Sequence, residues 1–386
     1  GGGGNDIISG KEGADIINGG AGNDVITHDV SGTSAIDVID GGAGDDTFKY
    51  VATADLVASD AFIDSITGGD DTDTIQINNN GGATFTIAAT DLWARVTGVE
   101  SITSADTDNV VSISLSDDAY TSGLRTVDLS GITTATDNMV INASGETGAN
   151  GFTLTGGAGI DTITGGAGND IITGGTGADI LNGGAGVDTI VGGAGIDVID
   201  GGAGADIITT SDTGATRVTI TEFATMDTVT GTWGAANNDI DLDFSDFSNS
   251  GPIILKSGAQ VTADSVAITL HAFTGALDLN DVTDAATNML VANHASNHAD
   301  TDALETALEA SGNQALTAQN AIAAGDEFLV LYDDGAHSYL AKVATTAGAA
   351  ADGATFPTGD LTAVNLVKFA GITDVATIDK AAFDFV

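Results

Sequence analysis

Apolar residues recur at every ninth position in the middle of the chain, and each follows an aspartate by two residues. Residues 156–209 read GGAGIDTIT GGAGNDIIT GGTGADILN GGAGVDTIV GGAGIDVID GGAGADIIT, six consecutive copies of GGxGxDxUx in which U is apolar. A strict period of this kind identifies a repeat architecture. The xUx tripeptide predicts a short strand with one inward side chain, and the glycines predict a tight turn before it. The predicted inward side chains are Ile163, Ile172, Leu181, Ile190, Ile199 and Ile208.

Residues 1–76 keep the same relation between aspartate and apolar residue with a less regular period. After three copies, a four-residue insertion near residues 30–33 precedes the next aspartate, and the nine-residue spacing then resumes. The aspartates are Asp6, Asp15, Asp24, Asp37, Asp46, Asp55, Asp64 and Asp73. The residues two positions after them are Ile8, Ile17, Ile26, Ile39, Phe48, Val57, Ile66 and Ile75. The pattern predicts that the repeated coil extends to residue 76.

Residues 77–155 lose the nonapeptide but keep short strand-like runs such as VSISLS, MVINAS and GFTLT. Alternate runs lie about 25 residues apart, which favours wider solenoid coils that bridge the two repeat blocks. A separate β-sandwich is the alternative, because short strands at such spacing also make sandwiches. GFTLT enters the second block in register, with Phe152 where an aspartate would stand.

Beyond residue 209 the composition changes, and runs such as VTITEF, SVAITLHAF and the pair FLVLY and SYLAKV indicate a small antiparallel β region. A helix is expected over residues 302–311. The predicted fold class is all-β, a parallel β-roll or β-helix solenoid. Its expected segments are a first roll at 1–76, irregular solenoid coils at 77–155, a second roll at 156–209 and the C-terminal β region at 210–386.

The chain is strongly acidic, with 55 Asp and Glu against 9 Lys and Arg and a formal net charge of −46. Such a field repels nucleic acid and anionic lipid, which excludes a nucleic-acid binder. No run of 18 apolar residues is present, so we expect no membrane insertion. Because the chain has no cysteine, an extracellular location requires a staple other than disulfides. Bound cations that neutralise the carboxylates would provide one.

The repeat suits a calcium site. Two nonapeptides complete one coil, so aspartates eighteen residues apart stack, and each neighbouring pair can share a Ca²⁺. Two carboxylates plus turn carbonyls reach the six to eight oxygen ligands that Ca²⁺ takes, and this nonapeptide is a calcium-binding β-helix repeat. We therefore expect several Ca²⁺ ions as cofactor. The predicted metal-binding aspartates are Asp6, Asp15, Asp24, Asp37, Asp46, Asp73, Asp161, Asp170, Asp179, Asp188, Asp197 and Asp206. The predicted metal-binding glycines are Gly156, Gly159, Gly165, Gly168, Gly174, Gly177, Gly183, Gly186, Gly192, Gly195, Gly201 and Gly204.

Tandem GGxGxDxUx in an acidic, cysteine-free chain resembles RTX proteins exported by bacterial type I secretion. The linking phrases VTGVESITS and LRTVDLSGITTATDNMVINAS, followed by the second repeat block, are similar to calcium-dependent S-layer proteins of Gram-negative bacteria. The resemblance implies an uncleaved C-terminal signal for the type I secretion machinery and a cell-surface location. It also implies that an N-terminal region outside this chain holds the protein to cell-surface polysaccharide.

No catalytic constellation is visible. His294 and His298 have a helical i,i+4 spacing that suits a transition metal, but HExxH is absent and an exposed polar loop is the preferred interpretation. Trp93 and Trp233 are expected to pack in a core or interface rather than against sugars.

Three functions remain open from the sequence. The preferred one is a structural, non-enzymatic surface protein that folds on Ca²⁺ after secretion and self-assembles into an S-layer-like lattice. The alternatives are a calcium-stiffened module of a large RTX adhesin and the C-terminal half of a secreted RTX hydrolase.

Overall fold

A computed structural model describes most of the chain up to residue 210 and separate segments beyond it. Up to residue 210 it omits 12, 29–35, 52–55, 59–60, 63, 79–83, 89–92 and 106–109. Beyond 210 it describes 216–220, 226–231, 239–242, 254–255, 259–260, 269–273, 277–278, 287–292, 316–317, 327–333, 337–345, 361–370 and 383–385. The chain forms two compact units, Gly1–Ile199 and Asp200–Val386. No helix among the described residues has both the length and the apolarity needed to cross a membrane.

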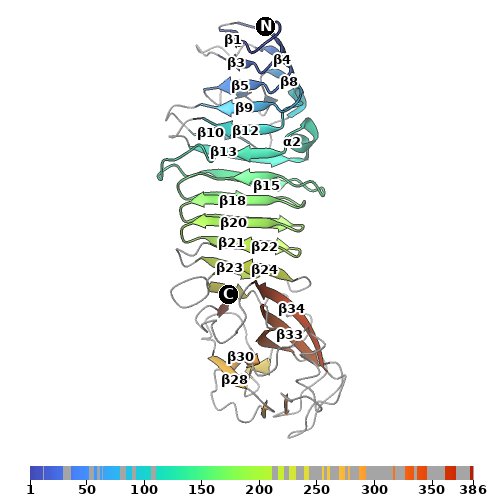
Figure 1. Ribbon diagram of the computed structural model, residues 1–386, viewed down its shortest axis with the longest axis vertical. Helices are drawn as coiled ribbons and strands as arrows, with labels where there is room; N and C mark the ends of the chain where they lie inside the picture. Colours follow the sequence, from blue (N-terminus) through green and yellow to red (C-terminus); the bar gives the residue numbers. More distant parts are fainter. Residues whose placement is uncertain are drawn as a thin grey trace. The chain divides into compact units, whose positions relative to one another are not determined.

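The first unit is a solenoid whose strands stack in parallel, one coil upon the next (Figure 1). One strand of each coil joins a long first sheet. In this unit the first sheet contains β1 (Ile7–Ser9), β3 (Val25–Thr27), β5 (Thr47–Tyr50), β9 (Thr74–Ile77), β12 (Ser101–Ser104), β14 (Thr126–Asp128), β16 (Thr153–Thr155), β18 (Ile171–Thr176) and β20 (Thr189–Ala194).

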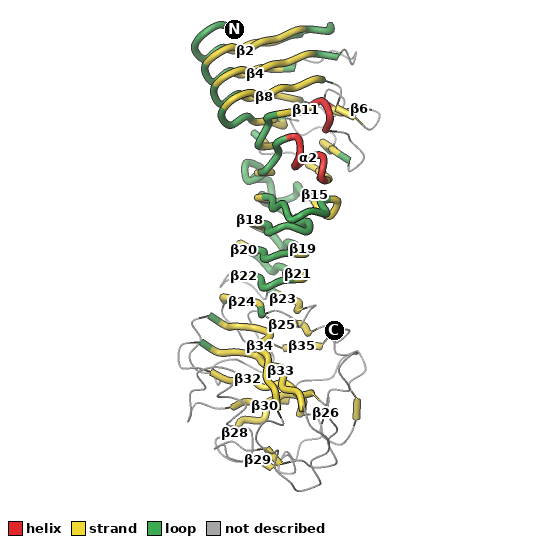
Figure 2. The backbone as a smooth tube through the Cα atoms, turned by 90° about the vertical axis from the view of Figure 1, so that its right-hand side faces the viewer, coloured by secondary structure: helices red, strands yellow, loops and turns green. Residues whose placement is uncertain are grey.

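The opposite side of each coil belongs to one of two further parallel sheets. Figure 2 shows the stack of the first of them at the N-terminal end of the unit. It consists of β2 (Ile16–Ala21), β4 (Val38–Ala43), β8 (Ser65–Asp70) and β11 (Val96–Thr97). The other contains β10 (Phe85–Ile87), β13 (Val111–Ser116), β15 (Val140–Gly145), β17 (Thr162–Thr164) and β19 (Ile180–Ala185). β21 (Val198–Ala203) includes the boundary between the units.

The register follows the nonapeptides as the sequence predicts. In the second repeat block Ile163 pairs with Leu181 and Ile172 with Ile190, so two nonapeptides make one coil. Near the N-terminus Val25 pairs with Thr47, a coil lengthened to 22 residues by the four-residue insertion. The predicted parallel β-roll is confirmed.

One expectation about residues 50–76 is wrong. The nonapeptide that contains Asp55 and Val57 was expected to form a half-coil of its own, but β4 pairs directly with β8, and that coil is 27 residues long. β6 (Val57–Ala58) and β7 (Ala61–Phe62) instead pair with each other, antiparallel. The sequence VATA before Asp55 lacks the glycines that the tight turn requires. DAFI before Asp64 lacks them too, yet β8 joins the stack, so missing glycines allow this departure but do not force it.

Residues 77–155 continue the solenoid with wider coils, as expected, and not as a sandwich. β12 pairs with β9 and β14, and β14 with β16, all in parallel. The extra length contains η1 (Trp93–Arg95) and the short helix α2 (Asp117–Ser122), which the sequence analysis did not predict. Trp93 is buried, as the packing interpretation requires. Trp233 and the expected helix at 302–311 lie outside the described residues.

The inward side chains form the core of the coils. The predicted inward residues of the second block that belong to the first unit are all buried. The predicted inward residues from Ile17 to Ile75 are also buried, wherever the structure describes their side chains. Ile8, in the first coil, is half-buried. Each strand of the second block contributes one apolar side chain to a narrow core, and longer strands such as β13 contribute more. This burial explains why the period of the inward residue survives where the glycines are lost.

The second unit combines parallel and antiparallel pairing. The expected hairpin of β32 (Glu327–Asp333) and β33 (Ser338–Thr345) is present, and β33 pairs antiparallel with β34 (Leu361–Phe369). The other long strands pair in parallel, so the expected antiparallel arrangement holds for only part of the region. These are β22 (Ile207–Thr209) with β24 (Asp227–Thr230), β24 with β34, β23 (Arg217–Ile220) with β25 (Asp239–Leu242), β25 with β35 (Phe383–Phe385), β28 (Thr269–Phe273) with β30 (Thr287–Ala292), and β30 with β32. Two short pairs complete the unit, β26 (Ile254–Leu255) with β27 (Ala259–Gln260), antiparallel, and β29 (Leu277–Asp278) with β31 (Leu316–Thr317), parallel.

Candidate metal-binding rows

The predicted aspartates of the first unit lie in two rows, one before each side of the coils. The first row precedes the first sheet and contains Asp6, Asp24, Asp46, Asp73, Asp170 and Asp188. The second row precedes the opposite strands and contains Asp15, Asp37, Asp64, Asp161, Asp179 and Asp197. All of these except Asp6 and Asp15 are buried. Asp206, in the second unit, is buried as well.

Within each row, one carboxylate oxygen binds the backbone of the preceding coil. The backbone N–H of Asp161 donates to Oδ1 of Asp179 at 2.9 Å, and that of Asp179 donates to Oδ1 of Asp197 at 3.0 Å. The first row repeats the pattern, with the N–H of Asp170 donating to Oδ1 of Asp188 at 2.7 Å. Oδ1 therefore fixes the register of neighbouring coils.

The other carboxylate oxygen points into the glycine turn of its own repeat. Oδ2 of Asp179 is buried and accepts no hydrogen bond. A Cβ on Gly174 would lie 2.5 Å from this oxygen and equally close to the carbonyl oxygen of Gly192 on the next coil. The first glycine of the repeat thus leaves the space in which a carboxylate oxygen and a carbonyl oxygen converge. The same unpartnered Oδ2 occurs at Asp15, Asp24, Asp46 and Asp73.

The predicted glycines serve two separate purposes. The first glycine of a repeat lies against Oδ2 of its own aspartate, and Gly183 contributes its carbonyl oxygen beside Gly165. The glycine at position four of the repeat brings coils together: Gly177 has a φ of 145°, and a Cβ there would collide with the carbonyl oxygen of Gly159. First glycines beside Oδ2 are Gly156, Gly165, Gly174, Gly192 and Gly201. Position-four glycines with positive φ are Gly159, Gly177, Gly186, Gly195 and Gly204, whereas Gly168 is confined by the carbonyl of Asn150.

Burial disfavours the charged form of these carboxylates when no cation is bound. The pKa of Asp179 is raised to about 7, mainly by loss of hydration; the hydrogen bond from the backbone of Asp161 opposes this rise, and the neighbouring charges of Asp161 and Asp197 add to it. Burial likewise raises the pKa of Asp73 to about 7. Burial also raises the pKa values of Asp46, Asp64, Asp161 and Asp170.

The sequence analysis missed one member of the first row. The N–H of Asp73 donates to a carboxylate oxygen of Glu100 at 2.9 Å, so Glu100 continues the row. The sequence contains the spacing that marks a row position, because Glu100 stands two residues before the buried Ile102. The same spacing identifies Asp227 in the second unit, two residues before Val229, where it accepts from the N–H of Asp206 at 3.0 Å.

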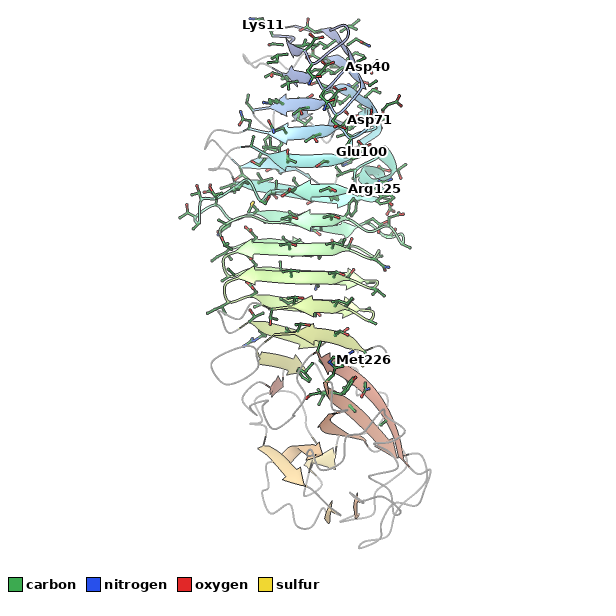
Figure 3. All side chains as sticks on the ribbon, viewed as in Figure 1. Lys11, Asp40, Asp71, Glu100, Arg125 and Met226 are labelled. Carbon is green, nitrogen blue, oxygen red and sulfur yellow. The ribbon has the colours of Figure 1, made fainter. Side chains whose placement is uncertain are left out.

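The first row is interrupted between Glu100 and Asp170. The N–H of Arg125 donates to the carbonyl oxygen of Glu100, and Figure 3 labels both residues on neighbouring coils. The guanidinium of Arg125 lies 3.6 Å from the ring centroid of Tyr120, whose ring meets that of Phe152 edge-on. The N–H of Phe152 donates to Oδ1 of Asp170, so Phe152 occupies an aspartate position, as expected. A cation–π pair and an aromatic ring replace the carboxylates in these two coils.

Asp37 and Asp64 differ from the other members of their row. Oδ2 of Asp37 lies 3.2 Å from Nδ1 of His28 instead of facing a glycine turn. Asp64, which is not among the aspartates predicted to bind metal, lies in the same row and also contacts His28. Asp55, His294 and His298 lie outside the described residues.

The donors of the glycine turns fit Ca²⁺. Buried carboxylate oxygens without a partner, converging with glycine carbonyl oxygens, offer only hard oxygen ligands. Comparison with known proteins agrees: a family model described as RTX calcium-binding nonapeptide repeat (4 copies) matches residues 1–30, 29–49, 52–76, 155–190 and 182–212. No curated protein and no solved structure gives a significant match. Proteins with such repeats are typically secreted or extracellular. The chain therefore carries RTX repeats in two blocks, and these repeats bind Ca²⁺ at several sites.

Proposed function

We propose that the protein is a structural, extracellular surface protein that folds on Ca²⁺ after secretion and assembles with its own copies into an S-layer-like lattice. The observation that carries this proposal is the distribution of the metal donors. Buried carboxylates follow the coils along the first unit instead of gathering at one centre. A cation set spread in this way supports the body of the protein, whereas a catalytic ion needs one open site.

Each residue type has a defined part in the folded, calcium-bound protein. The aspartate Oδ2 atoms and the glycine carbonyl oxygens would hold the ions, while the aspartate Oδ1 atoms keep neighbouring coils in register. Bound Ca²⁺ supplies positive charge that offsets the buried carboxylates. Extracellular modules of this kind bind Ca²⁺ at roughly 10⁻⁴ to 10⁻³ M, so the sites would stay empty in the cytosol and fill outside the cell.

Exposed apolar side chains on the coils support assembly. Ile160, Ile171, Ile180, Val187 and Ile196 are each about half exposed although they belong to a regular repeat. They offer lateral contacts, but a net charge of −46 keeps copies apart until divalent ions neutralise part of it. Assembly should therefore require calcium for two reasons. Calcium folds each copy of the protein, and it neutralises part of the negative charge that keeps the copies apart.

Light scattering and electron microscopy during a calcium titration test the lattice. We expect ordered sheets or filaments only when Ca²⁺ is present. A matched control replaces Ile171 and Ile180 by threonine, which already stands at the paired positions Thr189 and Thr162. This variant should bind the same number of ions and assemble less. A folded, calcium-saturated parent protein that stays monomeric at high concentration would contradict the proposal and favour the adhesin module.

A further inference from the structure

A buried cluster of mixed donors lies beside the second row, outside the glycine turns. His28 follows β3, Asp37 precedes β4, and Asp64 precedes β8, so the cluster joins the first sheet to the opposite one. Nδ1 of His28 lies 3.2 Å from Oδ2 of Asp37 and 3.4 Å from Oδ2 of Asp64. The side chain of His28 is 10% exposed, and those of Asp37 and Asp64 are 1% and 0% exposed.

The cluster is held in place by contacts that leave its donors facing one another. The Oδ1 atoms of Asp37 and Asp64 accept the N–H groups of Asp15 and Asp37, which turns both Oδ2 atoms toward the imidazole. The hydroxyl of Tyr50 donates to Oδ2 of Asp64 at 2.9 Å, and its ring stacks on that of His28 with centroids 5.4 Å apart. Such outer contacts fix the orientation of metal ligands.

The chemistry of these donors differs from that of the calcium turns. The sequences before Asp37 and Asp64, GTSAI and DAFI, do not contain the glycine pattern GGxGx that brings carbonyl oxygens beside Oδ2 elsewhere. An imidazole nitrogen takes their place, and Ca²⁺ prefers oxygen ligands whereas Zn²⁺ and related ions bind nitrogen well. Two buried carboxylates beside one imidazole also leave negative charge for a divalent ion to offset.

We propose that His28, Asp37 and Asp64 bind one transition-metal ion of the Zn²⁺ type, with Tyr50 as a positioning residue. The three donor atoms all lie within 4.8 Å of one another. Ligands about 2.0 Å from a tetrahedral zinc ion stand about 3.3 Å apart, so small shifts bring these three onto one ion and leave a fourth position for water. The proposal assigns Asp37 to this ion instead of the calcium expected from its spacing. The ion would fasten the two sheets together where two coils are lengthened by insertions.

The test titrates Co²⁺, a spectroscopic substitute for Zn²⁺, into the full chain at saturating Ca²⁺. We expect one tight site with the visible absorption of tetrahedral Co²⁺, and Zn²⁺ should displace the ion. His28→Phe, which keeps an aromatic ring against Tyr50, should weaken binding at least 100-fold. Tyr50→Phe should weaken it about 10- to 100-fold, the usual effect of losing an outer contact.

Two controls make the result decisive. The double variant His294→Ala, His298→Ala removes the other histidine pair and should leave Co²⁺ binding unchanged. Circular dichroism in Ca²⁺ checks that each variant folds, and Tyr50→Phe decides the question if His28→Phe does not fold. Any of four results would overturn the proposal. Co²⁺ could still bind to folded His28→Phe, or bind to Tyr50→Phe as tightly as to the parent protein. Alternatively, Co²⁺ binding could disappear in the double variant, or 10-fold more Ca²⁺ could remove it.

Discussion

The two oxygens of a row aspartate have different roles, and this division explains why aspartate is needed at the position. Oδ1 of Asp179 accepts a backbone N–H from the preceding coil, while Oδ2 remains without a partner beside Gly174. An asparagine could replace the first function but supplies no charge for the second. Coil register and ion binding therefore depend on one side chain.

Replacing Asp179 should reduce the number of bound Ca²⁺ ions more than replacing Asp6 does. Asp179 is buried between Asp161 and Asp197, whereas Asp6 is half-buried and, among the residues described, is linked in its row to Asp24 alone. We expect Asp179→Asn to lower the calcium stoichiometry measured by calorimetry by more ions than Asp6→Asn does. Equal losses in the two variants would argue against shared sites along the row.

Acidification should stabilise the calcium-free protein. The folded pKa of Asp73 and Asp179 is about 7, above the ordinary value of 3.8, so the folded state binds more protons than the unfolded chain between these values. Stability from these groups is therefore fully present below pH 3.8 and is lost as the pH rises through 7. Calcium-free protein should therefore regain part of its β signal in circular dichroism when the pH is lowered from 7 to 5, and Asp179→Asn should reduce the gain. A β signal in EGTA that is no greater at pH 5 than at pH 7 would refute the prediction.

At the scale of the element, each half-coil is a strand and a glycine turn, and the turn sets the spacing between coils. The first glycine makes room for oxygen atoms, and the glycine at position four lets backbones approach. Before Asp55, where VATA lacks these glycines, the chain between β5 and β8 forms the antiparallel pair β6 and β7 instead of a half-coil. β8 still joins the stack although DAFI before it also lacks glycine. Apolar periodicity alone therefore does not maintain the roll.

Gly174→Ala tests the role of the first glycine. The added Cβ would lie 2.5 Å from Oδ2 of Asp179, so we expect weaker calcium binding and a loss of about 1–3 kcal/mol in the free energy of unfolding, typical of overpacking. Gly3→Ala is the matched control, because a Cβ at Gly3 meets nothing within 4 Å. Denaturant unfolding in Ca²⁺ measures both, and similar stabilities would show that the space beside Asp179 is not required.

At the scale of the whole molecule, calcium takes the place of disulfides as the cross-link of a cysteine-free chain. The carboxylates of each row lie close together and are buried, so the calcium-free state is opposed by repulsion and lost hydration at neutral pH. This energetic opposition supports the proposal that the chain stays unfolded until it meets calcium outside the cell.

We predict that at neutral pH the protein folds only with millimolar calcium. Each site contributes about 1.4 kcal/mol when free calcium is ten times its dissociation constant, and the contributions add over several sites. Circular dichroism should show the β signal with 5–10 mM calcium, on the order of ten times that constant, and lose it in EGTA. An unchanged β signal in EGTA would rule out calcium-dependent folding.

The nonapeptides by themselves determined the parallel roll, its eighteen-residue coil and the inward apolar residues, because turn and strand signals in a repeat are local. The same pattern extended to Glu100 and Asp227, which a search for glycine-rich repeats alone overlooks. Only the tertiary structure showed that β6 and β7 pair with each other instead of forming a half-coil, and which side chains the lengthened coils bring into contact. His28 contacts Asp37 and Asp64 because coils of 22 and 27 residues still close onto the same register. Contacts between coils depend on register, and register after an insertion is set by packing of the whole stack rather than by the local sequence.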